Sequence, residues 1–139
     1  MKRLSNVLFS IAAAAALTTG FGIAQAAEPI NAVIPFDFTV GKTKMPAGHY
    51  SIETNKASRF VVIRDVANRR SAIVLWNADV PSQRQESYLT FRVHGSKHYL
   101  AGAQSSALGV AWDLAMTSAE REAMLAAGNQ TQTLFLALK

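Results

Sequence analysis

Short segments in which apolar and polar residues alternate recur along this chain, and they constrain its fold more than any other feature. In INAVIPFDFTV, residues 30–40, every even-numbered residue is apolar, whereas Asn31, Asp37 and Thr39 occupy odd positions. This period of two predicts a β-strand with one buried face. Pro35 cannot donate a backbone hydrogen bond, so the strand is expected to lie at a sheet edge or to bend there.

Turn residues divide the rest of the chain into further strands. Gly41 ends the first segment, and Met-Pro-Ala-Gly at 45–48 suits a tight turn because proline restricts φ and glycine accepts a positive φ. The segments at 60–63 and 71–78 are apolar on both parities, which predicts a central strand for the first and a strand covered on both sides for the second. Roughly seven or eight strands are predicted in all. The others lie at residues 49–54, 88–94, 98–101, 110–114 and 131–138.

One segment has the pattern of a helix. Thr117 and Glu120 match a capping box, in which the threonine hydroxyl and the glutamate carboxylate each bond an amide group at the helix start. The helix is predicted over residues 118–127, and Gly128 is the glycine expected just beyond a helix end. These elements predict a single, mainly β domain, an antiparallel β-sandwich or a small barrel with one short C-terminal helix.

The first 26 residues, MKRLSNVLFSIAAAAALTTGFGIAQA, have the pattern of a secretory signal peptide. A basic start is followed by an alanine-rich apolar run, and the small residues Ala24 and Ala26 fit a signal peptidase. Cleavage is expected after Ala26, with Ala27 as the neighbouring alternative. Residues 27–139 are then predicted to form one β-rich domain outside the cytoplasm, in the periplasm or the extracellular medium.

Charge and composition exclude several classes of partner and site. Loss of Lys2 and Arg3 with the signal leaves 12 basic residues against 9 acidic ones, a formal charge of +3 instead of +5. This small excess argues against a nucleic-acid partner, which would need more basic residues on one face. The chain has no cysteine, which excludes disulfides and cysteine-based metal sites. No apolar stretch after the signal is long enough to cross a bilayer as a helix, so no membrane span is expected.

Two groups of residues are candidates for binding a ligand. The densest basic patch is interpreted as an ordinary solvated turn, with an anion site as the alternative. The larger aromatic residues are candidates for a binding platform or, more simply, for the core. The basic patch comprises Arg59, Arg64, Arg69 and Arg70, and the aromatic group comprises Tyr50, Trp76, Tyr88, Tyr99 and Trp112.

Two histidines flank the turn predicted at residues 95–97. Across a three-residue loop, His94 and His98 would face each other and could share a metal ion if His49 or Asp113 came near as a further ligand. Across a two-residue turn, the register shifts and the two side chains point to opposite faces. The alternative without a metal has both histidines half-exposed at a hairpin tip. No ligand spacing specific to a metal is present, so no metal or other cofactor is predicted.

Hydrolytic chemistry has few candidate groups. Asp37 and Asp113 are candidates for a carboxylate pair, although Asp37 is expected on the solvent face of an edge strand. Glu120 and Glu122 are explained by the favourable position of negative charge at a helix start. A Ser-His-Asp arrangement stays open, because its members come together only in the fold. The sequence has no nucleophile elbow, P-loop or glycine-rich dinucleotide turn, so no catalytic residue is assigned.

The segment IPFDFTVGKTKMPAGHYSI, residues 34–52, resembles a family of small exported bacterial proteins of unknown function. Members open with an apolar-Pro-Phe-Asp-Phe strand, a glycine break and a Leu-Pro-Ala-Gly-x-Tyr turn, in which Met45 here replaces the leucine. LTFRVHGSKHYLAG, residues 89–102, is similar to the family's Phe-x-Arg-Tyr-Gly hairpin, with Val93 and His94 in place of arginine and tyrosine. TSAEREAMLA, residues 117–126, is similar to its Ser-x-x-Glu-Arg-Glu helix. The resemblance implies export and a β-rich fold, and it carries no established activity.

The leading hypothesis is an exported, noncatalytic β domain with a binding or structural role, its partner a protein or glycan of the cell envelope or the extracellular medium. One alternative is a small secreted hydrolase whose polar groups gather only in the fold, with Asp37, His49, His94 and Asp113 as candidates. Another is a carrier of an apolar ligand in a small barrel. A cleft that joins an acid and a histidine would favour the hydrolase, whereas scattered positions would count against it.

Overall fold

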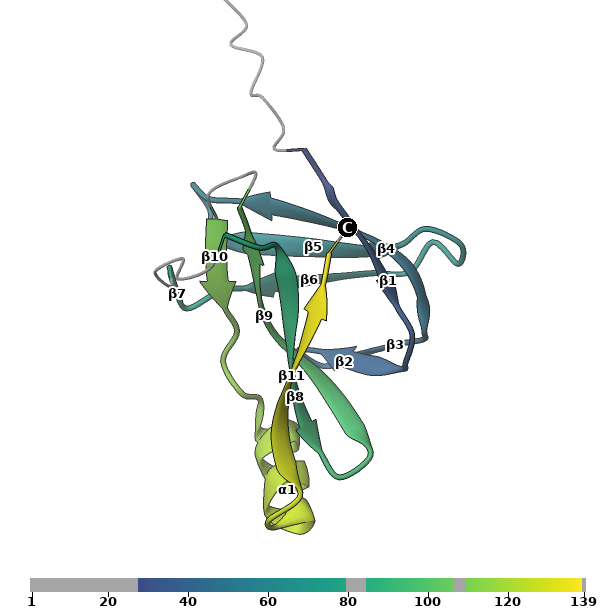
Figure 1. Cartoon of the computed structure of the whole chain (residues 1–139), viewed down its shortest axis with the longest axis vertical. Helices are drawn as coiled ribbons and strands as arrows, with labels where there is room; N and C mark the ends of the chain where they lie inside the picture. The colour runs from purple at the N-terminus through teal and green to yellow at the C-terminus, as the bar shows by residue number, and fades with distance from the viewer. Residues whose placement is uncertain (1–27, 80–84, 107–109, 139) are drawn as a thin grey trace, which may run out of the picture.

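Pro35 divides the first predicted strand, and the two halves enter different sheets of this computed structural model (Figure 1). The structure describes residues 28–79, 85–106 and 110–138. The predicted signal peptide, with its cleavage residues Ala24, Ala26 and Ala27, lies outside the described residues. The described strands form two sheets in a sandwich-like arrangement and do not close into a barrel. The prediction of a mainly β sandwich with one short helix is confirmed, and the barrel alternative is wrong.

The smaller sheet has four antiparallel strands in the order β1-β4-β5-β6. These are β1 (Ile30–Ile34), β4 (Gly48–Asn55), β5 (Phe60–Asp65) and β6 (Ser71–Leu75). The prediction that the strand at 60–63 is central is confirmed, because β5 lies between β4 and β6.

The prediction that the strand at 71–78 is covered on both sides is wrong. β6 is the edge strand of its sheet, and only Ala72 is fully buried on it. Ile73 and Leu75 point outward and are 69% and 72% exposed. Runs of apolar residues on both parities do not distinguish a covered strand from an edge strand with one apolar face in solvent.

The larger sheet has the order β11-β8-β9-β10-β7. A short hairpin of β2 and β3 attaches to it through one parallel pair, Thr39 with Tyr99. The strands are β2 (Phe38–Val40), β3 (Thr43–Met45), β7 (Ala78–Asp79), β8 (Tyr88–His94), β9 (Lys97–Ser105), β10 (Val110–Asp113) and β11 (Thr131–Ala137). The predicted count is low because Pro35 divides one predicted strand into β1 and β2, and because β3 and β7 are too short to show a period.

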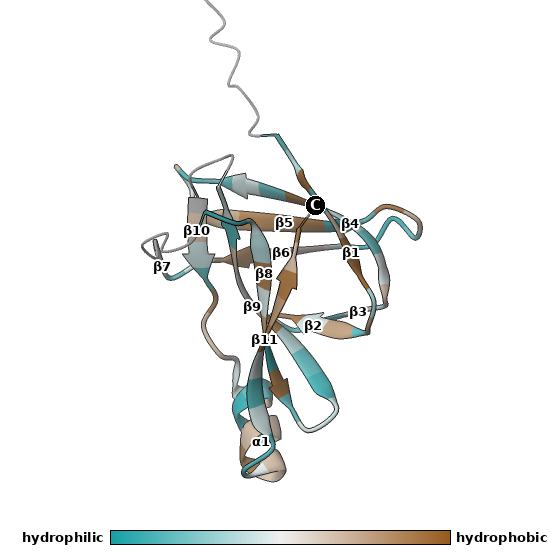
Figure 2. Cartoon of the chain, viewed as in Figure 1, coloured by the Kyte–Doolittle hydropathy of each residue, from teal (hydrophilic) through white to brown (hydrophobic). Residues whose placement is uncertain are grey.

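Apolar side chains from one face of each sheet meet to form the core. Even-numbered residues of the first segment enter it as predicted, with Ile34, Phe38 and Val40 buried and Asn31 and Asp37 exposed. Figure 2 shows the apolar residues of β5 and the polar tip of the β8–β9 hairpin. The buried members from other elements include Met45, Tyr50, Ile52, Val61, Ile63, Trp76, Leu89, Phe91, Leu100, Trp112 and Leu114.

β9 extends past the predicted end at residue 101, through Gly102 to Ser105. The small, polar sequence of this stretch resembles a loop, but all of these residues are buried where β9 pairs with β8 and β10. Gly102 fits a close backbone approach, because a Cβ there would lie 2.5 Å from the carbonyl oxygen of Trp112. The glycine at 102 therefore reflects close packing between strands and not a loop.

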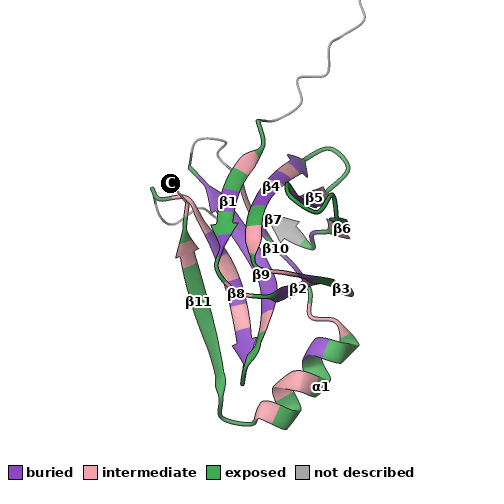
Figure 3. Ribbon diagram, turned by 90° about the vertical axis from the view of Figure 1, so that its right-hand side faces the viewer, coloured by how far each residue is buried: buried purple, intermediate pink, exposed green. Residues whose placement is uncertain are grey.

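Helix α1 (Ser118–Ala127) has the predicted bounds. Thr117 is the N-cap, its hydroxyl accepting a hydrogen bond from the Glu120 amide at 3.1 Å, and Gly128 follows the last turn with φ +59°. Figure 3 shows that most of the helix surface is exposed or half-buried, and Glu120 is its one buried residue. A charged side chain is therefore the one side chain of α1 that the fold buries fully.

Candidate functional site

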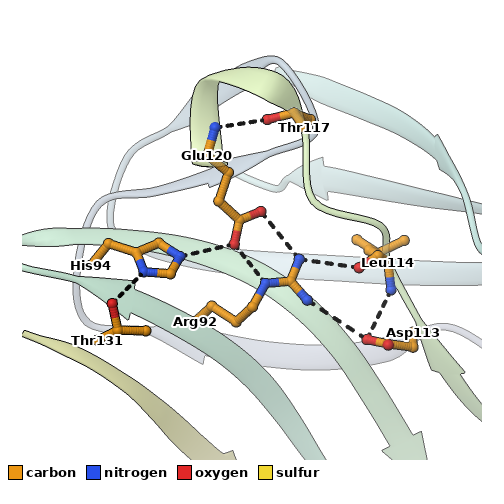
Figure 4. Close-up of polar contacts among 7 residues, drawn as sticks. All are labelled: Arg92, His94, Asp113, Leu114, Thr117, Glu120 and Thr131. Atoms are coloured by element: carbon orange, nitrogen blue, oxygen red, sulfur yellow. Dashed lines mark hydrogen bonds and ion pairs between the residues drawn. The ribbon is translucent and has the colours of Figure 1, made fainter. Parts of the chain in front are cut away.

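A buried network of charged and polar side chains joins α1 to the larger sheet (Figure 4). Arg92 and His94 lie two residues apart on β8, so their side chains share the face opposite the core. From the first turn of α1, the Glu120 carboxylate accepts hydrogen bonds from Arg92 Nε at 2.5 Å and Nη2 at 3.1 Å. Such a bidentate pair has strong charge-assisted hydrogen bonds.

His94 adds a second link to the same carboxylate. Its Nε2 lies 3.2 Å from Glu120 Oε1, and its Nδ1 lies 3.1 Å from the Thr131 hydroxyl on β11. Because a carboxylate only accepts, Nε2 carries a proton in this arrangement. When His94 is neutral, Nδ1 accepts from Thr131. One imidazole thus connects α1, β8 and β11.

The network also reaches the loop that leads into α1. Arg92 Nη2 donates to the Leu114 carbonyl at 3.1 Å, and Nη1 lies 3.9 Å from the carboxylate of Asp113. The side chains of His94 and Glu120 are 0% and 3% exposed, whereas that of Asp113 is 58% exposed. Because the side chains of His94 and Glu120 are enclosed, a substrate has no access to them in this conformation. Their role is to hold α1 in position.

The capping-box prediction is confirmed for Thr117 and wrong for Glu120. The Glu120 carboxylate turns away from the helix start and bonds Arg92 and His94. The explanation of Glu120 by the helix dipole alone is therefore incomplete. The sequence does indicate where the buried network lies, since Arg92 and His94 share one polar face of a predicted strand. Nothing local in the sequence indicates which carboxylate covers that face.

The turn between β8 and β9 has two residues, Gly95 and Ser96, so His94 pairs with Lys97 and Val93 pairs with His98. His94 and His98 consequently point to opposite faces of the hairpin, which removes the arrangement that the metal hypothesis required. The expectation that both are half-exposed is wrong for His94 and right for His98, whose ring stacks on Phe36 at 4.1 Å. Among the described residues, no three His, Asp or Glu side chains are placed to share a metal ion.

The four hydrolase candidates do not meet in one cleft. His94 and Asp113 belong to the network, but Glu120 and Arg92 separate them. His49 is exposed on β4 in the smaller sheet, and Asp37 is exposed just before β2.

An open cleft of about 380 Å³ lies between the β2–β3 hairpin and the tip of the β8–β9 hairpin. Asp37, Lys44, Lys97 and His98 line it, together with Arg70 from the β5–β6 turn. Lys44, Arg70 and Lys97 are exposed, and none of them forms an ion pair with a described residue. The cleft therefore presents three unpaired cations against one carboxylate.

Asp37 has a structural task in this cleft. Its Oδ1 accepts a hydrogen bond from the Ala47 amide at 2.9 Å, which ties the start of β2 to the turn before β4. Ser96 and His98 line the same cleft, so the residue types of a hydrolytic triad are present. Among the described contacts, no hydrogen bond joins Ser96, His98 and Asp37, so the orienting contacts of a triad are missing.

The basic residues predicted to form one patch are divided by β5. Arg59 precedes this strand, whereas Arg64, Arg69 and Arg70 lie at its far end or in the turn beyond it. The aromatic candidates Tyr50, Tyr99, Trp76 and Trp112 are buried, the two tryptophans stacked with ring centroids 6.2 Å apart. Burial, and to a smaller degree the charge of Glu120, raises the pKa of Tyr99.

These observations define the class: a two-sheet β domain with an open basic cleft and an internal charged network. No family model, curated protein or solved structure matches this chain. The helix in the described part has ten residues, which is too short to cross a membrane.

Proposed function

We propose that this chain is an exported, noncatalytic binding protein whose cleft holds an anionic group of a ligand in the cell envelope or the extracellular medium. This proposal rests on three cations that come from separate segments, line one cleft and form no ion pair with a described residue: Lys44, Arg70 and Lys97. Cations gathered on one concave surface raise the local concentration of anions and orient them.

Two features of the chain support the location. Residues 1–26 have a basic start, an apolar run and a small-residue cleavage site, and the resemblance to exported bacterial proteins points the same way. We propose cleavage after Ala26 and residence in the periplasm or the medium. Expression in a bacterium, followed by fractionation and N-terminal sequencing, is expected to give a chain that begins at Ala27. An intact Met1 in the cytoplasmic fraction would contradict export.

The chemistry of the network supports a noncatalytic role. His94 and Glu120, an imidazole and a carboxylate within hydrogen-bond distance of each other, are both enclosed. The carrier alternative is not proposed, because the described strands form a sandwich and not a barrel.

Binding is tested with digalacturonate, a disaccharide with two carboxylates, and with neutral maltose as the control ligand. Isothermal titration at low salt is expected to show binding of digalacturonate alone. Lys97→Glu reverses a charge in the cleft and is expected to weaken binding about tenfold or more. Lys56→Glu makes the same change in an exposed turn outside the cleft and is expected to leave binding unchanged. Equal affinities of the two variants would refute the cleft as the site.

The hydrolase is the second candidate, because the cleft joins an acid and a histidine. Incubation with acidic and neutral glycans or esters, followed by product analysis, separates it from a binding protein. Turnover by the unaltered chain that is lost in Ser96→Ala or His98→Ala would replace the binding proposal with a hydrolase.

A further inference from the structure

We infer that the ligand is a linear acidic polysaccharide that runs from the cleft, past Arg70, into a second hollow at the β5–β6 turn. This inference rests on the proposed function, because it extends the same binding site. The second hollow measures about 420 Å³ and is lined by Arg64, Asp65, Arg69 and Arg70, with Ser51, Val66 and Ser71. Arg70 lines both hollows, so the two adjoin the same exposed side chain, and the proposed ligand spans both.

Exposed basic residues line the two hollows, and we name four of them the basic track: Lys44 and Lys97 in the cleft, Arg70 in both hollows and Arg69 in the second hollow. All four side chains are exposed, and none forms an ion pair with a described residue. Arg64 is excluded from the track because it pairs with Glu53 at 3.0 Å. A single small anion would engage only part of such a track, whereas a chain with regularly spaced anions can engage all of it.

The carboxylate of the second hollow, Asp65, bonds groups of its own turn. Asp65 is buried and accepts hydrogen bonds from the amides of Ala67 and Asn68 and from the Asn68 side chain. The side-chain hydrogen bond from Asn68 contributes most to lowering the pKa of Asp65, which keeps this group ionised. The charge of Arg70 also contributes to lowering the pKa of Asp65, but neither Arg69 nor Arg70 forms an ion pair with this carboxylate, and both side chains stay exposed to a ligand.

The same turn holds the arginines in place. The Asp65 amide donates to the Arg70 carbonyl at 2.7 Å, and the Arg69 amide donates to the Asp65 carbonyl at 3.1 Å. Arg69 has φ +56°, in the left-handed region that side chains other than glycine rarely adopt.

Hydrogen-bonding groups along the track favour a sugar chain over a nucleic acid. Asp37, Ser96, Ser51 and Ser71 place a carboxylate and three hydroxyls beside the cations, which suits a ligand rich in hydroxyl groups. Nonspecific recognition of single-stranded nucleic acid uses exposed aromatic rings on which bases stack. The described Phe and Tyr residues of the two hollows, Phe38 and Tyr99, are buried, and the half-exposed His98 ring already stacks on Phe36.

The test compares digalacturonate with the dodecamer of the same acidic sugar by isothermal titration of the purified protein. The dodecamer is expected to bind at least tenfold more tightly, and a neutral maltooligosaccharide of similar length is expected not to bind. Longer chains also offer more binding registers, so length alone does not decide the question. Arg69→Gln is expected to weaken dodecamer binding about fivefold and to leave digalacturonate binding unchanged, whereas Lys97→Gln weakens both.

The outcomes distinguish the proposal of an extended basic track from the proposal that the cleft alone binds the anion. If digalacturonate binds but Arg69→Gln leaves dodecamer affinity unchanged, the track is refuted and the cleft stands. If neither acidic sugar binds, both proposals fall. Single-stranded DNA of twelve nucleotides that binds as tightly as the dodecamer would overturn the assignment to a polysaccharide. Lys56→Gln serves as the matched surface control and is expected to change none of these affinities.

Discussion

Replacement of Glu120 by glutamine tests whether the buried network holds α1 on the sandwich. The substitution preserves size and removes the charge that accepts from Arg92 at 2.5 and 3.1 Å and meets His94 at 3.2 Å. Arg92 then keeps the Leu114 carbonyl and a distant, exposed Asp113 as its partners. A largely buried guanidinium is thereby left without its main counter-charge.

The expected loss follows from burial. Removing one partner of a buried ion pair costs about 3–5 kcal/mol, because the remaining charge stays desolvated. The Arg92 side chain is 17% exposed and retains a carbonyl acceptor, so we expect about 2–4 kcal/mol for Glu120→Gln. A domain of this size is stable by about 5–15 kcal/mol. At about 4 °C per kcal/mol, the Tm should fall by about 8–16 °C.

Urea unfolding is monitored through two probes that report on different parts of the molecule. Tryptophan fluorescence reports on the core, where Trp76 and Trp112 are both buried, and amide hydrogen exchange reports on α1. Glu122→Gln makes the same chemical change at an exposed position of α1 and is expected to shift stability by less than about 0.5 kcal/mol. If Glu120→Gln changes both the unfolding free energy and the protection of α1 no more than this control, the network does not hold the helix.

Three further predictions concern single positions. Gly102→Ala places a Cβ 2.5 Å from a backbone oxygen and should cost about 1–3 kcal/mol in urea unfolding, whereas Gly48→Ala, with its nearest contact at 4.0 Å, should cost less; equal losses would contradict the packing argument. Arg59→Gly relieves a residue at φ +53° and should raise stability by about 0.5 kcal/mol, so a lower Tm would count against it. Burial, followed by the charge of Asp65, raises the pKa of Tyr50 from 10.0 to about 12. As the pH rises, the Tyr50 phenol therefore ionises at a lower pH in the unfolded chain than in the folded one. The associated stability is complete below pH 10 and is lost as the pH rises to about 12. Absorbance titration of phenolate should show late titration of both Tyr50 and Tyr99, and the step near pH 12 should be missing in Tyr50→Phe.

Elements with a strong local pattern were predictable. The helix bounds follow from the Thr117 cap and Gly128, and β8 follows from an unbroken alternation of seven residues. Pro35 marks the break between β1 and β2 because it lacks an amide hydrogen. The coverage of β6 was not predictable, since an apolar side chain looks the same in sequence whether a second sheet lies over it or solvent does.

The candidate site was less predictable than the fold. Asp37, His98 and Arg70 were considered separately, for different reasons, while Lys97 was predicted only as part of a turn and Lys44 was assigned no role. They meet because β2 pairs with β9 at Thr39 and Tyr99, sixty residues apart in the chain, which sets two hairpins side by side. No local pattern specifies a contact over that separation.

Taken alone, the sequence determined the elements whose causes are local: alternating strands, glycine and proline turns, a capped helix and an N-terminal segment with the pattern of an export signal. Tertiary structure decided which charges meet. The Glu120 carboxylate bonds Arg92 and His94 instead of the helix start, because an enclosed charge requires partners. Lys44, Lys97 and Arg70 lie together in the open cleft, where water can solvate cations that have no ion pair. Which partners a charged side chain has depends on its burial, and burial is set only when the two sheets have packed together.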